Sequence, residues 1–287
     1  MKITYLLLLL FFTINVHAQF NSDSYTVSLS DLKTNVYKKD STANALVIYE
    51  HGKSFIDDES YNLVTETKRK LKIINSNGFE KATISIYLYN NGNKKEKLSH
   101  VIATTYNAEG NSMVQTKLNQ QDIFKEKYND HYTIAKFTLP NIKEGSVITY
   151  SYTIQSPFMF KYKGWEFQDD IPKLYSEYRT SIPGNWEYNI KLVGGKKLSI
   201  NEQEVKRNCL SVSNGAYADC VNSIYAMQDI PAFIEEDYMT SKSNYLARIE
   251  YELKVFQGFD GTINNYTKSW KTADKEFRTD KDIGRQL

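Results

Sequence analysis

Two cysteines, Cys209 and Cys220, are the residues whose types and spacing most directly suggest a covalent function. A cysteine nucleophile needs a histidine base within hydrogen-bond reach, and no spacing in the sequence places a histidine beside either cysteine. The Asn214-Gly215 dipeptide between them is typical of a two-residue hairpin turn. Pairing outward from that turn sets Leu210 opposite Asp219 and Cys209 opposite Cys220. In an oxidising compartment such a pair forms a disulfide, so we predict a Cys209–Cys220 bridge and keep an enzyme based on Cys209 as the alternative.

The sequence lacks the residues that a metal site or a phosphate-binding site needs. Zinc sites use closely spaced His and Cys ligands, whereas His51, His100 and His131 are far apart and have no such neighbours. The segment from His51 to Ser54 ends like a phosphate-binding loop, but Val47 stands where its first glycine belongs. We therefore expect no metal site, no cofactor and no catalytic residue in this chain.

Three clusters of acidic residues are a weaker indication of a functional site. They lie at 57–59, 169–170 and 235–237, and none follows the ligand spacing of a calcium loop. We interpret them as solvated turns.

Aromatic side chains crowd the segment 158–167. If exposed, such rings could line a sugar-binding platform; if buried, they would belong to the core or to an interface, which is the more common situation. We keep Trp165, Phe167 and Trp186 as a candidate binding surface.

The elements that must position these residues are mainly strands. Apolar and polar side chains alternate in 82–89, 146–154 and 248–255, which predicts antiparallel strands with one face on a core. Further strands are expected at 45–50, 62–74, 98–106, 113–118, 132–139, 175–181 and 186–193. Beyond Gly258, Trp270, Ala273 and Phe277 recur at helical spacing. The predicted fold is all-β: a large antiparallel β-sandwich with a short helical C-terminal segment.

Charge argues against a nucleic-acid partner. The whole sequence has a net charge of only +2, whereas nucleic-acid binding needs a concentrated basic face. The densest basic cluster, Lys68, Arg69, Lys70 and Lys72, lies in an alternating segment. We interpret it as a solvated strand or a charged, protected sheet edge.

The N-terminus has the layout of a secretory signal peptide. Lys2 is followed by an apolar stretch, 3–16, and by the small-residue cut site Val16-His17-Ala18. An N-terminal membrane anchor is the alternative, but the stretch is short for a membrane span. We predict cleavage after Ala18, no transmembrane span afterwards, and a periplasmic or secreted protein associated with the cell envelope. We divide the chain into the signal peptide at 1–18, the sandwich at 19–258 and a helical linker, or the start of an absent domain, at 259–287.

Several blocks resemble a known family. They are Gly145 to Tyr152 (GSVITYSY), Trp165 to Gln168 (WEFQ) with Ser176-Glu177-Tyr178, and Ile230 to Tyr238 (IPAFIEEDY) with Asn244 to Ile249 (NYLARI). Together they resemble the domain of unknown function that precedes the transglutaminase-like core in exported bacterial proteins.

The resemblance implies an accessory role. The Cys-His-Asp triad of that family belongs to the domain that follows, so no catalytic residue is carried over to this chain. Our hypothesis is a non-catalytic accessory or substrate-docking domain whose partner is a transglutaminase-like catalytic domain. The rival is an autonomous module that binds a carbohydrate or another envelope component, such as an envelope protein, through Trp165 or Trp186.

Overall fold

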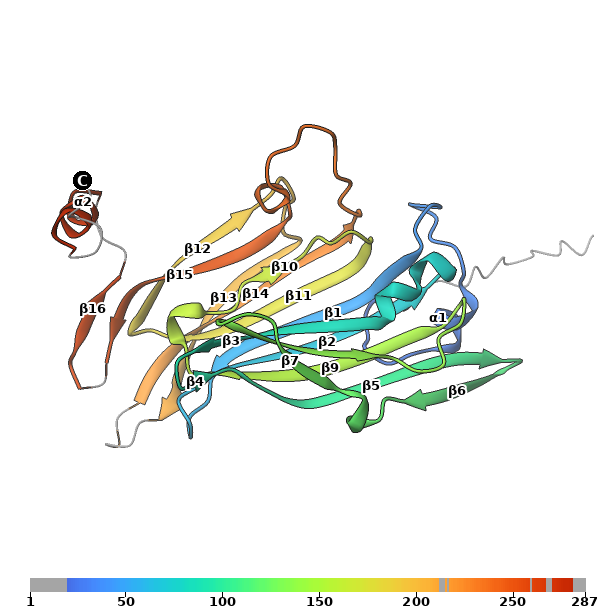
Figure 1. Cartoon of the computed structure of the whole chain (residues 1–287), viewed down its shortest axis with the longest axis horizontal. Helices are drawn as coiled ribbons and strands as arrows, with labels where there is room; N and C mark the ends of the chain where they lie inside the picture. The colour runs from blue at the N-terminus through green and yellow to red at the C-terminus, as the bar shows by residue number, and fades with distance from the viewer. Residues whose placement is uncertain (1–19, 212–214, 216, 259, 267–269, 281–287) are drawn as a thin grey trace, which may run out of the picture.

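The computed structural model describes residues 20–211, 215, 217–258, 260–266 and 270–280. The predicted signal peptide, the Asn214 half of the predicted turn and the end of the chain after Asp280 lie outside these residues. The described part forms one long eight-stranded sheet with two four-stranded sheets (Figure 1). Both small sheets share buried cores with the same face of the large sheet, so the fold is a sandwich with a divided second layer.

The large sheet is mixed rather than purely antiparallel. Its spatial order is β13 (Ile200–Ser211), β14 (Tyr217–Ile230), β11 (Lys173–Pro183), β1 (Ala45–Ile56), β2 (Leu63–Ile73), β9 (Val147–Ser156), β5 (Lys97–Glu109) and β6 (Ser112–Lys117). β1 and β11 are parallel, and the other neighbouring pairs are antiparallel. The parallel pair arises because the chain crosses the second layer before it enters β11, and so begins β11 at the same end as β1.

The second layer consists of two sheets. One contains β4 (Lys94–Lys95), β3 (Thr83–Asn91), β8 (Tyr132–Thr138) and β7 (Phe124–Lys127). The other contains β10 (Trp165–Glu166), β15 (Arg248–Gln257), β12 (Trp186–Val193) and β16 (Ile263–Asn265). The helices are α1 (Leu29–Lys33) and α2 (Trp270–Thr279), with short 3-10 turns at η1 (Ser76–Ala82), η2 (Gln120–Asp122), η3 (Met159–Lys161) and η4 (Lys242–Asn244).

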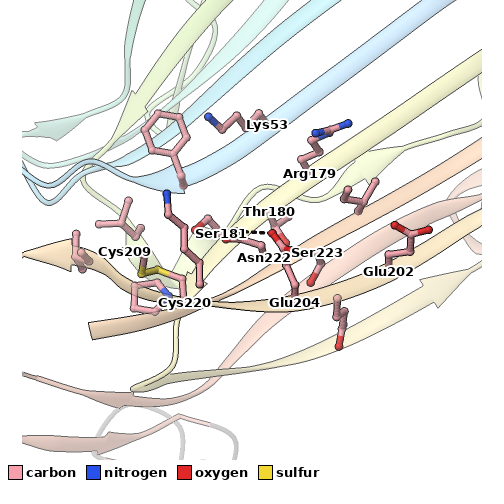
Figure 2. Close-up of a pocket in the computed structure, with 17 residues that line it drawn as sticks. Lys53, Arg179, Thr180, Ser181, Glu202, Glu204, Cys209, Cys220, Asn222 and Ser223 are labelled. Atoms are coloured by element: carbon pink, nitrogen blue, oxygen red, sulfur yellow. Dashed lines mark hydrogen bonds between the residues drawn. A yellow bond between two sulfur atoms is a disulfide. The ribbon is translucent and has the colours of Figure 1, made fainter. Parts of the chain in front are cut away.

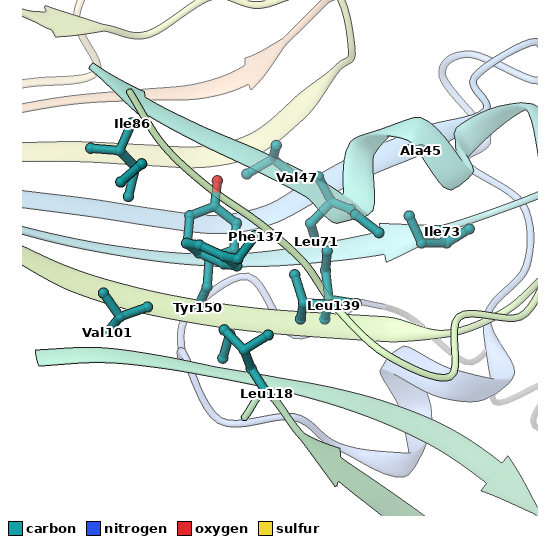
Figure 3. Close-up of a cluster of buried hydrophobic side chains, with 14 of the residues drawn as sticks. Ala45, Val47, Leu71, Ile73, Ile86, Val101, Leu118, Phe137, Leu139 and Tyr150 are labelled. Atoms are coloured by element: carbon teal, nitrogen blue, oxygen red, sulfur yellow. The ribbon is translucent and has the colours of Figure 1, made fainter. Parts of the chain in front are cut away.

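The largest core lies between the large sheet and the β3–β8 sheet (Figure 3). Val47, Leu71 and Tyr150 project from neighbouring strands of the large sheet, and Ile86 and Phe137 face them from the small sheet. Ile86 and Phe137 alternate with exposed positions along β3 and β8, as the sequence pattern predicts, whereas Val47 and Leu71 lie between buried neighbours because both faces of the large sheet are covered there. Burial of this apolar face is the main force that holds the two layers together.

The opposite face of the large sheet is covered at one end by the N-terminal segment. Lys70 and Lys72 are 0% exposed and point into that segment. Lys70 Nζ lies 3.3 Å from Asp31 Oδ2, and Lys72 Nζ donates to the carbonyl oxygens of Asp31, Leu32 and Gly145 at 2.7–3.1 Å. The prediction of a solvated strand or protected edge is therefore wrong for Lys70 and Lys72, although Lys68 is exposed. β2 is a central strand, and two of its lysines fasten α1 to the sheet.

The predicted fold class is confirmed: the protein is mainly β with a short C-terminal helix, α2. Each strand expected from alternation is present. β13 and β14 were not predicted as full strands, and β16 continues the pairing beyond Gly258. No helix among the described residues is long and apolar enough to cross a membrane.

Candidate functional site

The aromatic residues proposed as a binding surface belong to the core. Trp165, Phe167 and Trp186 are 8%, 0% and 6% exposed. Trp165 stacks on Tyr178 with 5.1 Å between ring centroids, and Trp186 stacks on Phe256. These rings fill the space between the β10–β15–β12 sheet and the large sheet, so they offer no surface to a glycan.

A buried charge network lies beside Trp165. Glu50 Oε2 accepts from Lys173 Nζ and from Ser176 Oγ, both at 2.7 Å, and Glu50 Oε1 accepts from Arg69 Nε at 2.6 Å. The Glu50 side chain is 2% exposed. Burial opposes its charge, but Arg69 and Lys173 outweigh that effect and lower the pKa of the carboxyl group. The network is internally satisfied, so we assign it a structural role.

A hollow lies on the face of the large sheet that points away from the second layer, beyond the end of that face that α1 covers. This groove has a volume of about 760 Å³ and crosses β1, β11, β14 and β13 (Figure 2). Its floor follows the strand register. One row contains Lys53, Arg179, Ile224 and Glu202, and the next contains Ser181, Asn222 and Glu204.

Charged side chains line the groove on both sides. Figure 2 shows Lys53 and Arg179 on one side and Glu202 and Glu204 on the other. Lys206 of β13 also lines the groove, on the strand that carries the two carboxylates. Arg179 is 50% exposed and donates to Glu177, while Glu204 accepts weakly from Asn222 at 3.4 Å. Opposite charges on the two sides suit a polar ligand that carries both signs, such as an extended polypeptide.

A second polar cluster adjoins the groove on the same face. Glu177 accepts hydrogen bonds from Tyr175 and from Arg179, and His51 Nε2 lies 3.6 Å from its carboxylate. Burial alone would raise the pKa of Glu177, but these two hydrogen bonds lower it. Burial also lowers the pKa of His51, which favours the neutral ring.

This His-Glu pair resembles half of a catalytic triad. However, among the described residues no Ser, Thr or Cys side chain hydrogen-bonds to His51, so no nucleophile is paired with it. His100 and His131 lie on other elements, and no group of three potential ligands among the described residues could hold a metal ion.

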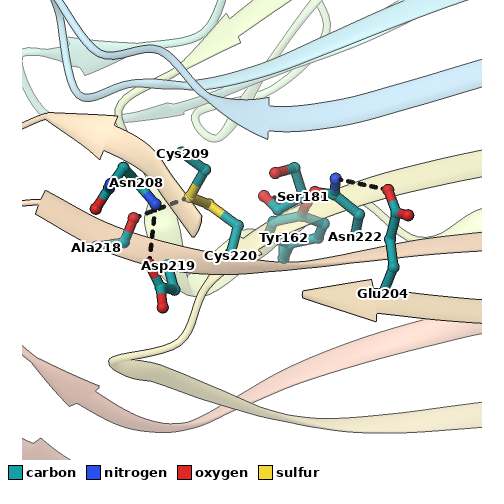
Figure 4. The surroundings of a disulfide bond; sticks show 9 residues. All are labelled: Tyr162, Ser181, Glu204, Asn208, Cys209, Ala218, Asp219, Cys220 and Asn222. Carbon is teal, nitrogen blue, oxygen red and sulfur yellow. Dashed lines mark hydrogen bonds between the residues drawn. A yellow bond between two sulfur atoms is a disulfide. The ribbon is translucent and has the colours of Figure 1, made fainter. Parts of the chain in front are cut away.

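The disulfide forms one end of the groove, and it joins the two predicted cysteines, Cys209 and Cys220 (Figure 4). Their Cα atoms are 5.7 Å apart. The predicted register was wrong by one residue, because Leu210 pairs with Ala218 and not with Asp219. A register shift between Lys206 and Leu210 brings Cys209 back to Cys220; within it, Asn208 has φ 51° and its backbone N–H donates to Asp219.

Replacing either cysteine by serine is expected to destabilise the protein by about 3 kcal/mol, because the bridge closes a short loop in the unfolded chain. Urea unfolding of Cys209→Ser and Cys220→Ser measures this loss, with the wild type as reference. Equal losses in the two variants are expected. Two reactive thiols in the non-reduced wild type would contradict the bridge.

The sequence matches DUF3857, a domain of unknown function with solved structure, over residues 59–216. The chain belongs to the DUF3857 family. No curated protein matches the sequence. A solved structure from Parabacteroides distasonis, named a "putative protease", superposes with a TM-score of 0.54 at 11% identity.

That similarity shows a shared fold. It covers 72% of this chain and 40% of the Parabacteroides protein, so the DUF3857 chain corresponds to less than half of that protein. The family match begins after β1 and ends before β14. The groove is therefore only partly inside the matched region, since β1 supplies Lys53 and β14 supplies Cys220.

Sequence reasoning identified the disulfide but missed the groove and the Glu50 network. Lys53 and Glu202 lie in strands that are far apart in the sequence. Only the parallel β1–β11 pair and the β13–β14 hairpin bring them to one face. The sequence did offer one signal for the groove. Charged residues are unusually dense in 202–207, which lie along a long exposed strand.

Proposed function

We propose that this DUF3857 chain is a non-catalytic docking domain of an exported transglutaminase- or protease-like protein. In this proposal the groove beside the disulfide binds an extended polypeptide segment of a transglutaminase-like catalytic core. The groove, in which Lys53 and Arg179 lie across from Glu202 and Glu204, is the observation that carries the proposal. Its floor is fixed by four paired strands.

Three further observations support a docking role. Both cysteines are bound to each other, so neither is available as a thiolate nucleophile. His51 is oriented by Glu177 but has no nucleophile as its partner among the described residues. The fold is similar to part of the longer Parabacteroides protein that is named a "putative protease". This is consistent with a domain that works beside a catalytic one.

Calorimetric titration with a separately expressed Cys-His-Asp core from the same genome tests the proposal. We expect binding that weakens at least tenfold in Lys53→Glu and in Glu202→Lys, because each reversal sets like charges against the ligand. Lys117→Glu is the matched control, since Lys117 is exposed on β6 at the other edge of the same sheet. Unchanged affinity in both groove variants would exclude the groove.

Catalysis is tested separately with amidase and transglutaminase substrates. We expect no turnover by the isolated protein. Turnover that is lost in Cys209→Ser but kept in Cys220→Ser would assign a nucleophile and overturn the proposal. The second variant is needed because both substitutions break the same disulfide.

A further inference from the structure

A group of aromatic rings, three of them exposed and two half-buried, covers the outer face of the β3–β8–β7 sheet. It contains Tyr87 and Tyr89 of β3, Tyr132 of β8, Phe124 of β7 and Tyr128 just beyond β7. We call these five residues the aromatic patch. Phe124, Tyr128 and Tyr87 are 68%, 60% and 46% exposed, which is unusual for large rings. Contiguous exposed aromatic surface of this kind marks an interaction site.

The strand register places the patch on one face. Ile84, Ile86 and Leu88 of β3 point into the core, so Tyr87 and Tyr89 point outward. Tyr89 pairs with Tyr132, Tyr87 pairs with Ile134, and Glu126 lies beyond Ile134 on β7. Phe124 shares the outward face because it stands two residues before Glu126.

The rings hold one another in place. Tyr87 packs edge-to-face on Tyr128 at 5.3 Å between centroids and on Tyr132 at 6.5 Å, and Tyr132 packs on Tyr89 at 5.4 Å. Such mutual contacts fix the side chains before any ligand arrives, which lowers the entropic cost of binding. Within the described part of the chain, the hydroxyls of Tyr87, Tyr128 and Tyr132 form no hydrogen bond, so they remain available to a ligand.

Positive charge surrounds the patch. Lys161 Nζ lies 3.2 Å from the Tyr89 ring centroid and 5.6 Å from that of Tyr132. Lys136 stands between Ser85 and Phe124 in the cross-strand row, and Lys94 and Lys95 follow on β4 beside Asn91 and Asn90. Glu96, Glu126 and Asp130 are the nearby carboxylates, and Asp130 pairs with a further lysine, Lys127. The four lysines around the patch therefore leave a local excess of positive charge.

We propose that the aromatic patch binds an acidic carbohydrate, that is, a glycan whose sugars carry carboxylates. The apolar faces of sugar rings stack on aromatic rings, the free phenol hydroxyls meet sugar hydroxyls, and the lysines pair with the carboxylates. An acidic polypeptide is the nearest competitor. Such a polypeptide could add as a strand to the exposed β7 edge, but that edge carries Lys125 and Lys127, which disfavour strand addition. This inference concerns a different face from the docking groove and does not depend on the proposed function.

Affinity electrophoresis and calorimetry of the intact exported protein test the proposal, with polygalacturonate, alginate and hyaluronate as acidic glycans. We expect binding to at least one of them and none to dextran, which is neutral. Phe124→Ala and Tyr128→Ala are each expected to weaken binding at least tenfold, and Lys136→Glu by a similar factor. Tyr238→Ala is the control for an exposed ring and Lys117→Glu for an exposed charge, and neither should change the affinity.

Poly-L-glutamate and phosphatidylglycerol vesicles separate the glycan from other anionic partners. Both should bind more weakly than the acidic glycan and should not respond to Phe124→Ala. If polyglutamate binds as tightly and is lost only in Lys136→Glu, the surface recognises charge alone, and the glycan proposal is wrong. Preference for vesicles would assign a lipid surface instead. Failure of all three acidic glycans to bind would also contradict the glycan proposal.

Discussion

Replacing Glu50 with alanine is expected to lower the free energy of unfolding by about 3–5 kcal/mol, because the change leaves two cations without their buried partner. Arg69 and Lys173 would then face each other across an empty position between β2 and β11. Glu50 also accepts from Ser176, whose hydroxyl in turn accepts from Trp165 Nε1 at 2.9 Å, so the loss would reach the aromatic core. Chemical denaturation monitored by tryptophan fluorescence measures the effect.

The pH dependence gives a second readout of the same network. The folded-state pKa of Glu50 is lowered, so its charge contributes stability above its unfolded pKa. That contribution is lost as the pH falls through the lowered, folded-state value. Wild-type stability should therefore fall more steeply on acidification than that of Glu50→Gln, which has no carboxyl group to protonate there.

Glu109→Gln is the matched control for this prediction. Glu109 is exposed at the end of β5, and its substitution should change stability by less than about 0.5 kcal/mol. If Glu50→Gln proved as stable as the wild type at neutral pH, the network would contribute no net stability. A buried ion pair can behave in that way when desolvation cancels its attraction.

The strands were predictable because one physical signal dominates them. Segments such as β3 and β15 alternate between core and solvent, and a period of two in the sequence is enough to identify them. β13 lacked that signal because residues 201–208 are exposed on both faces and carry polar side chains at every position except Val205. Its strand conformation comes from pairing with β14, and the residue pattern of β13 does not indicate that pairing.

Buried charges account for the other differences. Lys70, Lys72 and Arg69 are adjacent in a basic stretch that looks solvated in the sequence. The two lysines point to one face and the arginine to the other, and each finds a partner that is remote along the chain. A charge can be buried only where such tertiary partners surround it, so its burial cannot be predicted from the neighbouring sequence. The disulfide was predictable because its partners are close in sequence, although a shifted register makes the contact.

The two faces of the large sheet therefore have different roles. The inner face carries the aromatic core and the Glu50 network, whose polar groups are satisfied by one another. The outer face, beyond the end that α1 covers, keeps Lys53, Arg179, Glu202 and Glu204 accessible in a groove. Substitutions on the inner face should act on stability, and substitutions of these four groove charges should act on binding while leaving stability nearly unchanged.

Gly52→Ala is expected to destabilise the protein by about 1–3 kcal/mol, although alanine is usually preferred to glycine inside a strand. A Cβ atom on Gly52 would lie 2.3 Å from Cζ3 of Trp165, closer than any real contact. The indole cannot withdraw easily, because it stacks on Tyr178 and donates to Ser176. Gly195→Ala is the control, since a Cβ there meets no atom within 4 Å.

The same contact makes a double substitution informative. Trp165→Ala alone should cost about 3–5 kcal/mol through the cavity that it leaves. In that background Gly52→Ala should cost nothing or restore some stability, because its methyl group then enters the cavity instead of the indole ring. The two changes should therefore be non-additive by about 1–3 kcal/mol, which urea unfolding of the wild type, the two single variants and the double variant measures. Additive losses would show that the strand tolerates a methyl group at position 52 by another route, and that Trp165 is not what requires glycine there.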